Sequence, residues 1–127
     1  MTERNQVSRG RATLLLHIAE RQSWAAAVQS GEYRPATLNH EGFIHCSLPE
    51  QVVPVADSLY RGRKGLVLLL IDPVQVPAEI RYEDCYESGQ EFPHIYGPLP
   101  VEAVKQVLDF PPGPDGRFTL PSATTEP

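Results

Sequence analysis

The chain has 127 residues, a formal net charge of −5 and 41% hydrophobic residues, which suits one domain with a modest core. This acidic chain lacks the basic footprint of nucleic-acid-binding proteins, so we expect no nucleic-acid partner. Its two cysteines match no zinc or redox spacing, and the absence of a secretory leader indicates the cytoplasm. The longest apolar run, GLVLLLI, is far shorter than the ~20 residues of a membrane-spanning helix, so we expect no membrane partner.

The two ends of the chain differ from its body. Residues 1–11 are polar and are expected to form a disordered leader. Residues 111–127 are rich in proline, which interrupts helices and central strands, and are interpreted as a tail with Phe118 and Leu120 packed on the domain. The globular domain is therefore expected to span residues 12–110.

The body begins with a short apolar strand, TLLLHIA (Thr13–Ala19). The alanine-rich stretch Glu20–Gln29, ended by a Ser-Gly pair, predicts a helix. Residues 32–40 contain a proline and an asparagine and are expected to be irregular. EGFIHCS (Glu41–Ser47) alternates its side chains and predicts a second strand.

The next stretch predicts a helix and a buried strand. Ser47 followed by glutamate three residues later matches a capping box, so Ser47 is expected to cap a helix over Pro49–Tyr60. GLVLLLIDP (Gly65–Pro73) predicts a fully buried strand because a glycine and an Asp-Pro pair flank it.

Strands accumulate toward the end of the body. IRYEDC (Ile80–Cys85) and Val104–Phe110 predict strands, whereas two prolines limit any strand within Glu91–Pro100 to a short piece. Residues 100–104 are expected to form one helical turn. Helices early and strands late indicate the α+β class, in a single compact domain with two helices near the N-terminus.

Three histidines are each the single imidazole of an apolar run: His17, His45 and His94. His40 lies in a polar stretch and is expected to be solvated. A buried imidazole needs hydrogen-bond partners, which a backbone carbonyl or a ligand can supply. Both alternatives stay open, and we predict one concave pocket lined by the three rings, with Tyr96 at its edge.

Other polar residues also lie in apolar surroundings. Arg81 and Glu83 share one face of their strand, as a weak ion pair or as an anion clamp beside a carboxylate. A metal site made by His17, His45 and His94 is conceivable, but no histidine pair has close helical spacing, and we expect no metal.

Four stretches resemble a small bacterial family filed as domain of unknown function 952: the H-x6-W spacing from His17 to Trp24, EGFIHCS, IRYE and FPHIYGPL. The resemblance spans residues 13–110. The fold of that family is similar to the ADP-ribosyltransferase superfamily, particularly its RNA 2′-phosphotransferase branch. The resemblance implies a split, curved, mostly antiparallel β-sheet.

In that superfamily the chemistry is attack on the nicotinamide ribose carbon of NAD, from which nicotinamide leaves as an oxocarbenium-like centre develops. The resemblance therefore implies NAD as cofactor, with His17 gripping the ribose and His45 at the second motif position, close to Ser47. The third catalytic position stays open among Glu83, Glu91 and His94.

The pyrophosphate of NAD would need a forked donor, and Arg81 or Arg34 would supply it. Tyr96 would complete the binding residues. We expect a small-molecule ligand, and three alternative functions for the protein follow. They are an NAD-dependent transferase-like enzyme, a non-catalytic small-molecule or nucleotide binding module, and a metal-dependent hydrolase. The residues leave open whether the protein is an enzyme.

Overall fold

The computed structural model describes residues 14–85 and 87–122. The expected leader, residues 1–11, lies outside the described residues. In chain order the elements are β1 (Leu15–Glu20), α2 (Arg21–Ser30), β2 (Glu32–Tyr33), α3 (Ala36–Glu41), β3 (Ile44–His45), α4 (Pro49–Leu59), β4 (Leu66–Ile71), η1 (Pro73–Gln75), β5 (Glu79–Glu83), β6 (Phe92–Tyr96), β7 (Leu99–Pro100), η2 (Val101–Ala103) and β8 (Val104–Asp109).

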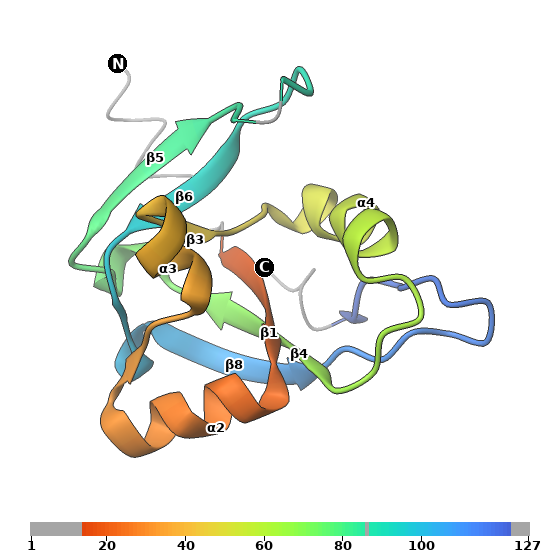
Figure 1. The fold of residues 1–127 in the computed structure, drawn as a ribbon, viewed down its shortest axis with the longest axis horizontal. Coiled ribbons are helices and arrows are strands. Elements are labelled where there is room, and N and C mark those ends of the chain that lie inside the picture. Colours follow the sequence, from red (N-terminus) through yellow and green to blue (C-terminus); the bar gives the residue numbers. More distant parts are fainter. Residues whose placement is uncertain (1–13, 86, 123–127) are drawn as a thin grey trace.

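The strands form three antiparallel sheets, in the orders β1-β4-β8, β2-β7 and β3-β6-β5 (Figure 1). The α+β class is confirmed. The described residues form three α-helices, one more than expected. None of these helices combines the length and the apolar character needed to cross a membrane.

The strand β4 lies at the centre of the fold, and all six of its residues are buried. Alternate side chains of a strand point to opposite faces. Val67, Leu69 and Ile71 join one apolar cluster with Ala27 of α2 and Ile95 of β6. The even-numbered residues between them join a second cluster against α4 and Phe118. Apolar cover on both faces explains why GLVLLLI has no polar alternation.

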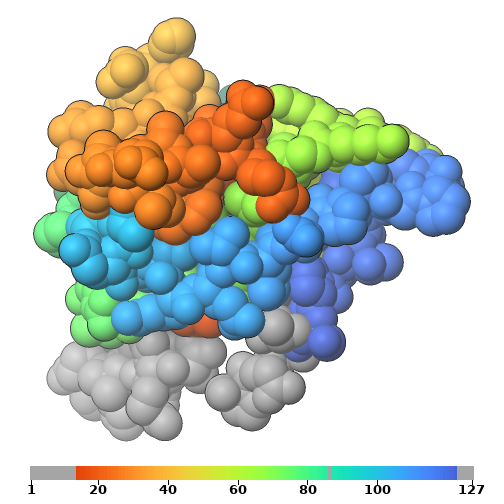
Figure 2. All heavy atoms as spheres, turned by 90° about the horizontal axis from the view of Figure 1, so that it is seen from below, coloured from red at the N-terminus to blue at the C-terminus, as the bar shows by residue number. Residues whose placement is uncertain are grey.

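The proline-rich segment after β8 returns to the body. Phe118 is buried and stacks on Phe110, with ring centroids 4.8 Å apart. Its backbone N–H donates to Asp57 of α4 at 2.8 Å. Figure 2 shows this blue segment against the lime-green turn after α4, where Gly62 N–H donates to the carbonyl of Gly116. Leu120 packs on the same cluster.

The stretch before EGFIHCS is helical rather than irregular. Pro35 stands at the N-cap of α3, a position where its missing N–H is not needed. Gly42 ends the helix at a φ of 88°, in the left-handed region that favours glycine, and its N–H donates to Leu38. The expectation was wrong because Pro35 begins a helix here instead of breaking one. The strand shortens to Ile44–His45 for the same reason.

The cap of α4 is also displaced from its predicted position. Leu48 is the N-cap, and its backbone N–H donates to Oε1 of Gln51 at 2.9 Å. Ser47 instead forms an isolated antiparallel bridge with Leu16 through two 2.8 Å backbone hydrogen bonds. The capping box with Ser47 and Glu50 was therefore wrong by one residue, because strand pairing fixes the backbone of Ser47 in the bridge.

Candidate functional site

His17 lies on β1 and is held on both sides by neutral groups of the protein. Its Nδ1 donates to the carbonyl of His45 at 2.5 Å, and its Nε2 accepts from the Tyr33 hydroxyl at 2.7 Å. A carbonyl only accepts, so this pair of bonds fixes the tautomer. Burial lowers the pKa of His17 to about 4. His17 is therefore a neutral imidazole with both nitrogens bonded.

A cavity of about 540 Å³ lies at the outer edge of β1, between that strand, α4 and the loop before β6. Its lining consists of Leu16, His17, Ile18, Thr37, His45, Cys46, Ser47, Gln51, Pro54, Val55, Ser58, Leu59, Tyr60, Ser88, Gln90 and Phe92. The bridge between Leu16 and Ser47 closes one part of this edge and brings β1 beside the start of α4. β1 and the loop before β6 lie more than 70 positions apart in the sequence, so only the tertiary structure assembles the cavity.

The lining is apolar with scattered hydroxyl and amide groups. Among the described residues, no lysine, arginine, aspartate or glutamate lines it. Gln51 is fixed by two bonds: its carbonyl accepts from Leu48, and its amide donates to the carbonyl of Glu91 at 2.8 Å. The cavity thus offers neutral polar groups to a ligand.

A second group of polar residues lies on one face of the β3-β6-β5 sheet. His45 and His94 are paired across β3 and β6, and their ring centroids lie 5.4 Å apart. Phe43 stacks on His94 at 4.2 Å. His45 is partly exposed and contacts Glu41 at 2.6 Å. His94 is fully buried.

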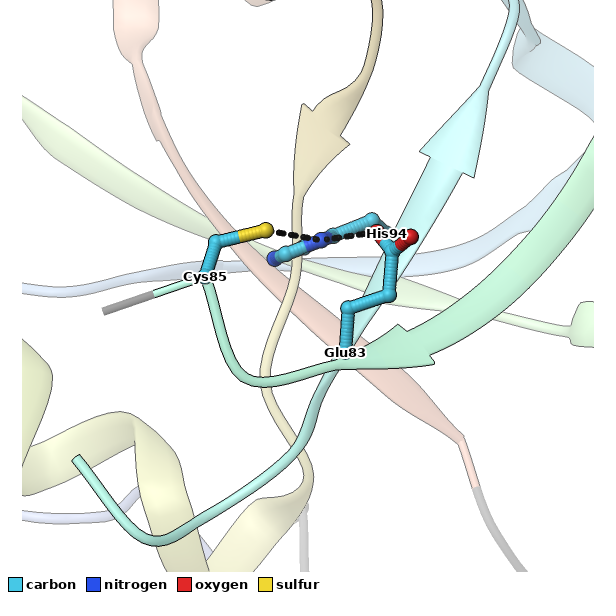
Figure 3. Close-up of side chains that lie close together, drawn as sticks. All are labelled: Glu83, Cys85 and His94. Atoms are coloured by element: carbon cyan, nitrogen blue, oxygen red, sulfur yellow. Dashed lines mark hydrogen bonds and ion pairs between the residues drawn. The ribbon is translucent and has the colours of Figure 1, made fainter. Parts of the chain in front are cut away.

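Glu83 connects His94 to its surroundings. One oxygen, Oε1, accepts from the Tyr96 hydroxyl at 2.6 Å and from Nδ1 of His94 at 2.9 Å. These hydrogen bonds, the one from Tyr96 foremost, hold the pKa of Glu83 below its usual range. Nδ1 of His94 also lies 3.8 Å from the sulfur of Cys85 (Figure 3).

The two arginines expected to bind pyrophosphate are paired elsewhere. Arg81 lies 3.0 Å from Glu79 and 4.0 Å from Glu83, and its guanidinium covers the Tyr96 ring at 4.4 Å. Arg34 pairs with Glu32 at 3.1 Å. Both arginines are exposed, and neither lines the cavity. The arrangement of Arg81 matches the ion-pair alternative, which contributes little to stability at the surface.

The structure therefore divides the predicted single pocket into two neighbouring sites. His17, His45 and Ser47 line the cavity, whereas His94, Glu83, Tyr96 and Arg81 are not part of its lining. The backbone of His45 joins the two through its bond to His17. Cys85 was not among the predicted site residues. The sequence signal for Cys85 was its position two residues after Glu83, which places both side chains on the same face of an extended chain.

A further hollow of about 460 Å³ lies where the proline-rich segment meets the turn after α4. Arg21 and Lys64 contribute positive charge there, but Arg21 is already paired with Asp109 at 2.9 Å. None of the four histidines lines this hollow. The histidine-lined cavity is the better candidate for a ligand site, because apolar walls with a few polar groups are typical of such sites.

Fold and cavity together define a small α+β protein of antiparallel sheets with two buried histidines. The family model described as protein of unknown function (DUF952) matches residues 18–107, and the chain belongs to this family.

Solved structures of protein CC0527 from Caulobacter crescentus are similar to this chain. Its crystal structure has 32% identity and a TM-score of 0.80, and the match covers 90% of this chain and 100% of CC0527. A double methionine variant of CC0527 gives the same values. The solution NMR structure has 32% identity and a TM-score of 0.75, and covers 87% of this chain and 95% of CC0527. The search of curated proteins found no match.

Proposed function

We propose that this protein is a binding module for a small, uncharged and largely apolar molecule held in the cavity beside β1. One observation carries the proposal: a cavity of about 540 Å³ whose described lining holds no acidic or basic side chain apart from neutral His17 and the partly exposed His45. The volume suits a drug-sized or smaller molecule.

The polar groups of the lining would orient such a ligand. The backbone of Ser47 is used by Leu16, so its hydroxyl is the part that can reach a ligand. Ser58 and Gln90 face the same space. A hydroxyl or amide group on the ligand would match them, because buried polar groups bind with selectivity when they are paired.

The histidines of the cavity support binding more than catalysis. Both ring nitrogens of His17 are bonded within the protein, so this ring fixes the wall and has no nitrogen to offer a substrate. A general base needs a ring nitrogen within hydrogen-bond reach of its substrate. The Nε2 of His45 instead contacts the carboxylate of Glu41.

The NAD-dependent transfer implied by the resemblance is the second candidate, favoured by the position of His17 and His45 beside one cavity. Divided antiparallel sheets also agree with an ADP-ribosyltransferase-like fold. Pyrophosphate requires cationic or backbone donors, and Arg34 and Arg81 lie outside the lining. A neutral ligand is therefore better supported.

Both cysteines are free thiols, which supports the cytoplasm as the location of the protein.

Titration followed by backbone amide NMR tests the proposal. Benzamide and indole serve as neutral probes, and NAD as the anionic one. We expect saturable shifts at cavity residues with a neutral probe and weaker or no shifts with NAD. Ser58 lies at the exposed rim of the cavity on α4, and Ser58→Trp places an indole ring there. This variant should weaken neutral-probe binding roughly tenfold or more, equivalent to about 1.4 kcal/mol.

The matched control is Ser23→Trp, the same change on the exposed surface of α2, which should leave binding as in the wild type. Stronger binding of NAD than of both neutral probes would replace the proposal by the NAD-dependent alternative. Equal binding by the wild type and Ser58→Trp would place the probe outside the cavity and end the proposal.

A further inference from the structure

Three potential metal ligands converge at the end of the β5–β6 hairpin. A carboxylate oxygen of Glu83, the sulfur of Cys85 and a ring nitrogen of His94 all lie within 4.8 Å of one another. Figure 3 shows the sulfur and the carboxylate on either side of the imidazole. The ligand atoms are a carboxylate, a thiol and an imidazole, which is the donor set of zinc sites.

The hairpin holds these residues in place. Glu83 ends β5, Cys85 follows two residues later, and His94 stands on the paired strand β6. The carboxylate of Asp84 accepts from the backbone N–H groups of Ser88 at 2.9 Å and Gly89 at 2.8 Å. These bonds tie the turn together and keep Cys85 directed toward His94.

We propose that Glu83, Cys85 and His94 bind one divalent transition-metal ion of the zinc class, with one coordination position open to solvent or to a further ligand. Tetrahedral zinc bonds of about 2.0–2.3 Å place neighbouring ligand atoms about 3.3–3.8 Å apart. The Nδ1 of His94 lies 2.9 Å from Glu83 and 3.8 Å from Cys85. These two distances are within a few tenths of an ångström of the tetrahedral values. The third, between Glu83 and Cys85, is at most 4.8 Å, so an ion would draw the carboxylate and the sulfur together by up to about 1.3 Å. It would also replace the proton that Glu83 and His94 share.

The local field favours a cation. Partial loss of solvation raises the pKa of the exposed Cys85 thiol, and the carboxylates of Glu83, Asp84 and Glu41 raise it further. The same three negative charges attract a divalent ion. Arg81 opposes it, but this guanidinium is bonded to Glu79 and lies 4.0 Å from the other oxygen of Glu83.

Neighbouring residues would fix the orientation of the ligands. The Tyr96 hydroxyl donates to the Oε1 of Glu83, and the Phe43 ring stacks on His94. Hydrogen-bonded partners of this kind hold metal ligands in position and tune their affinity. Cys85 is exposed, which gives an ion access to the buried imidazole.

Titration of the reduced, metal-free protein with Co²⁺ alone, and in competition with Zn²⁺ alone, tests this site. We expect one ion per chain, a thiolate-to-cobalt charge-transfer band and the visible bands of tetrahedral Co²⁺. Cys85→Ser should abolish the charge-transfer band and weaken binding roughly tenfold or more. Cys85 is exposed, so this variant should fold as the wild type does, whereas substitution of the buried His94 would disturb the core.

Glu83→Gln tests the carboxylate, and Glu50→Gln, the same change on the exposed surface of α4, is its matched control. We expect weaker binding in Glu83→Gln and wild-type affinity in Glu50→Gln. A charge-transfer band that survives in Cys85→Ser, equal losses in both glutamate variants, or the absence of any thiolate band would overturn the site. Glu83, Cys85 and His94 are not part of the cavity lining, so this result and the neutral-probe titration fail independently.

Discussion

The two buried histidines of this protein differ in the charge of their partners. His17 is bonded to a carbonyl and a phenol, and burial keeps its ring neutral. His94 is also buried, but it is bonded to a carboxylate that water still reaches, next to a thiol. The hydrogen-bond partners of each ring therefore set its role more than its burial does. His17 holds the core together, whereas His94 belongs to the proposed set of metal ligands.

The difference arises from the strands that carry the two rings. β1 is flanked by β4 and by the bridge to Ser47, so both nitrogens of His17 meet neutral groups of the protein, while the ring also lines the cavity. β6 is paired with β5, whose outer face carries glutamate and arginine side chains beside His94. The same residue type in a similar apolar run therefore takes a structural position in one sheet and a ligand-bearing position in the other.

The largest expected effect concerns the acid sensitivity of the His17 region. The folded pKa of about 4 lies below the unfolded value of 6.5, so protonation favours the unfolded state. Stability is complete above pH 6.5 and should fall as the pH drops toward 4, by roughly 3 kcal/mol at most. Urea denaturation across this range should show the loss in the wild type and a smaller loss in His17→Gln.

Tyr33→Phe keeps the buried imidazole and serves as the control for acid sensitivity. This variant should retain the acid-side loss. Parallel stability curves for the wild type and His17→Gln would contradict a neutral, buried His17.

A smaller effect on stability distinguishes Tyr33, which is bonded to His17, from Tyr96, which is bonded to the Glu83 partner of His94. Tyr33→Phe removes the donor to Nε2 of His17 inside the core and should cost about 1–3 kcal/mol of unfolding free energy. Tyr96→Phe removes a donor to Glu83, which water can replace, so its stability should stay close to that of the wild type. Denaturation of both variants at neutral pH measures the contrast, and an equal loss would remove the distinction between the two regions.

The smallest effect distinguishes two residues at the start of α4. Gln51→Ala removes the cap on Leu48 and the bond to Glu91, and should cost about 1–2 kcal/mol. Ser47→Ala keeps both backbone bonds to Leu16, so its stability should be nearly unchanged. Thermal denaturation compares them. A larger loss in Ser47→Ala would restore Ser47 as the stabilising residue, and weaker neutral-probe binding with unchanged stability would place its hydroxyl in the cavity.

Much of the fold was predictable from local pattern. The buried strand β4, the helix α4 and the late strands follow from apolar runs and their flanking breakers. The helix α3 was missed because Pro35 is equally compatible with a break and with a helix start. The cap of α4 was misplaced because the bridge between Leu16 and Ser47 has no local signal.

Local patterns in the chain place three histidines in apolar runs, set Glu83 and Arg81 on one strand face and indicate the α+β class. Which of these groups meet depends on contacts between distant strands. Strand register sets His45 opposite His94 and Arg81 opposite His94, and a shift by one residue would turn every one of these side chains to the other face. The turn after β5 then brings Cys85 to His94, a contact between residues nine positions apart that depends on hairpin geometry rather than on either residue alone.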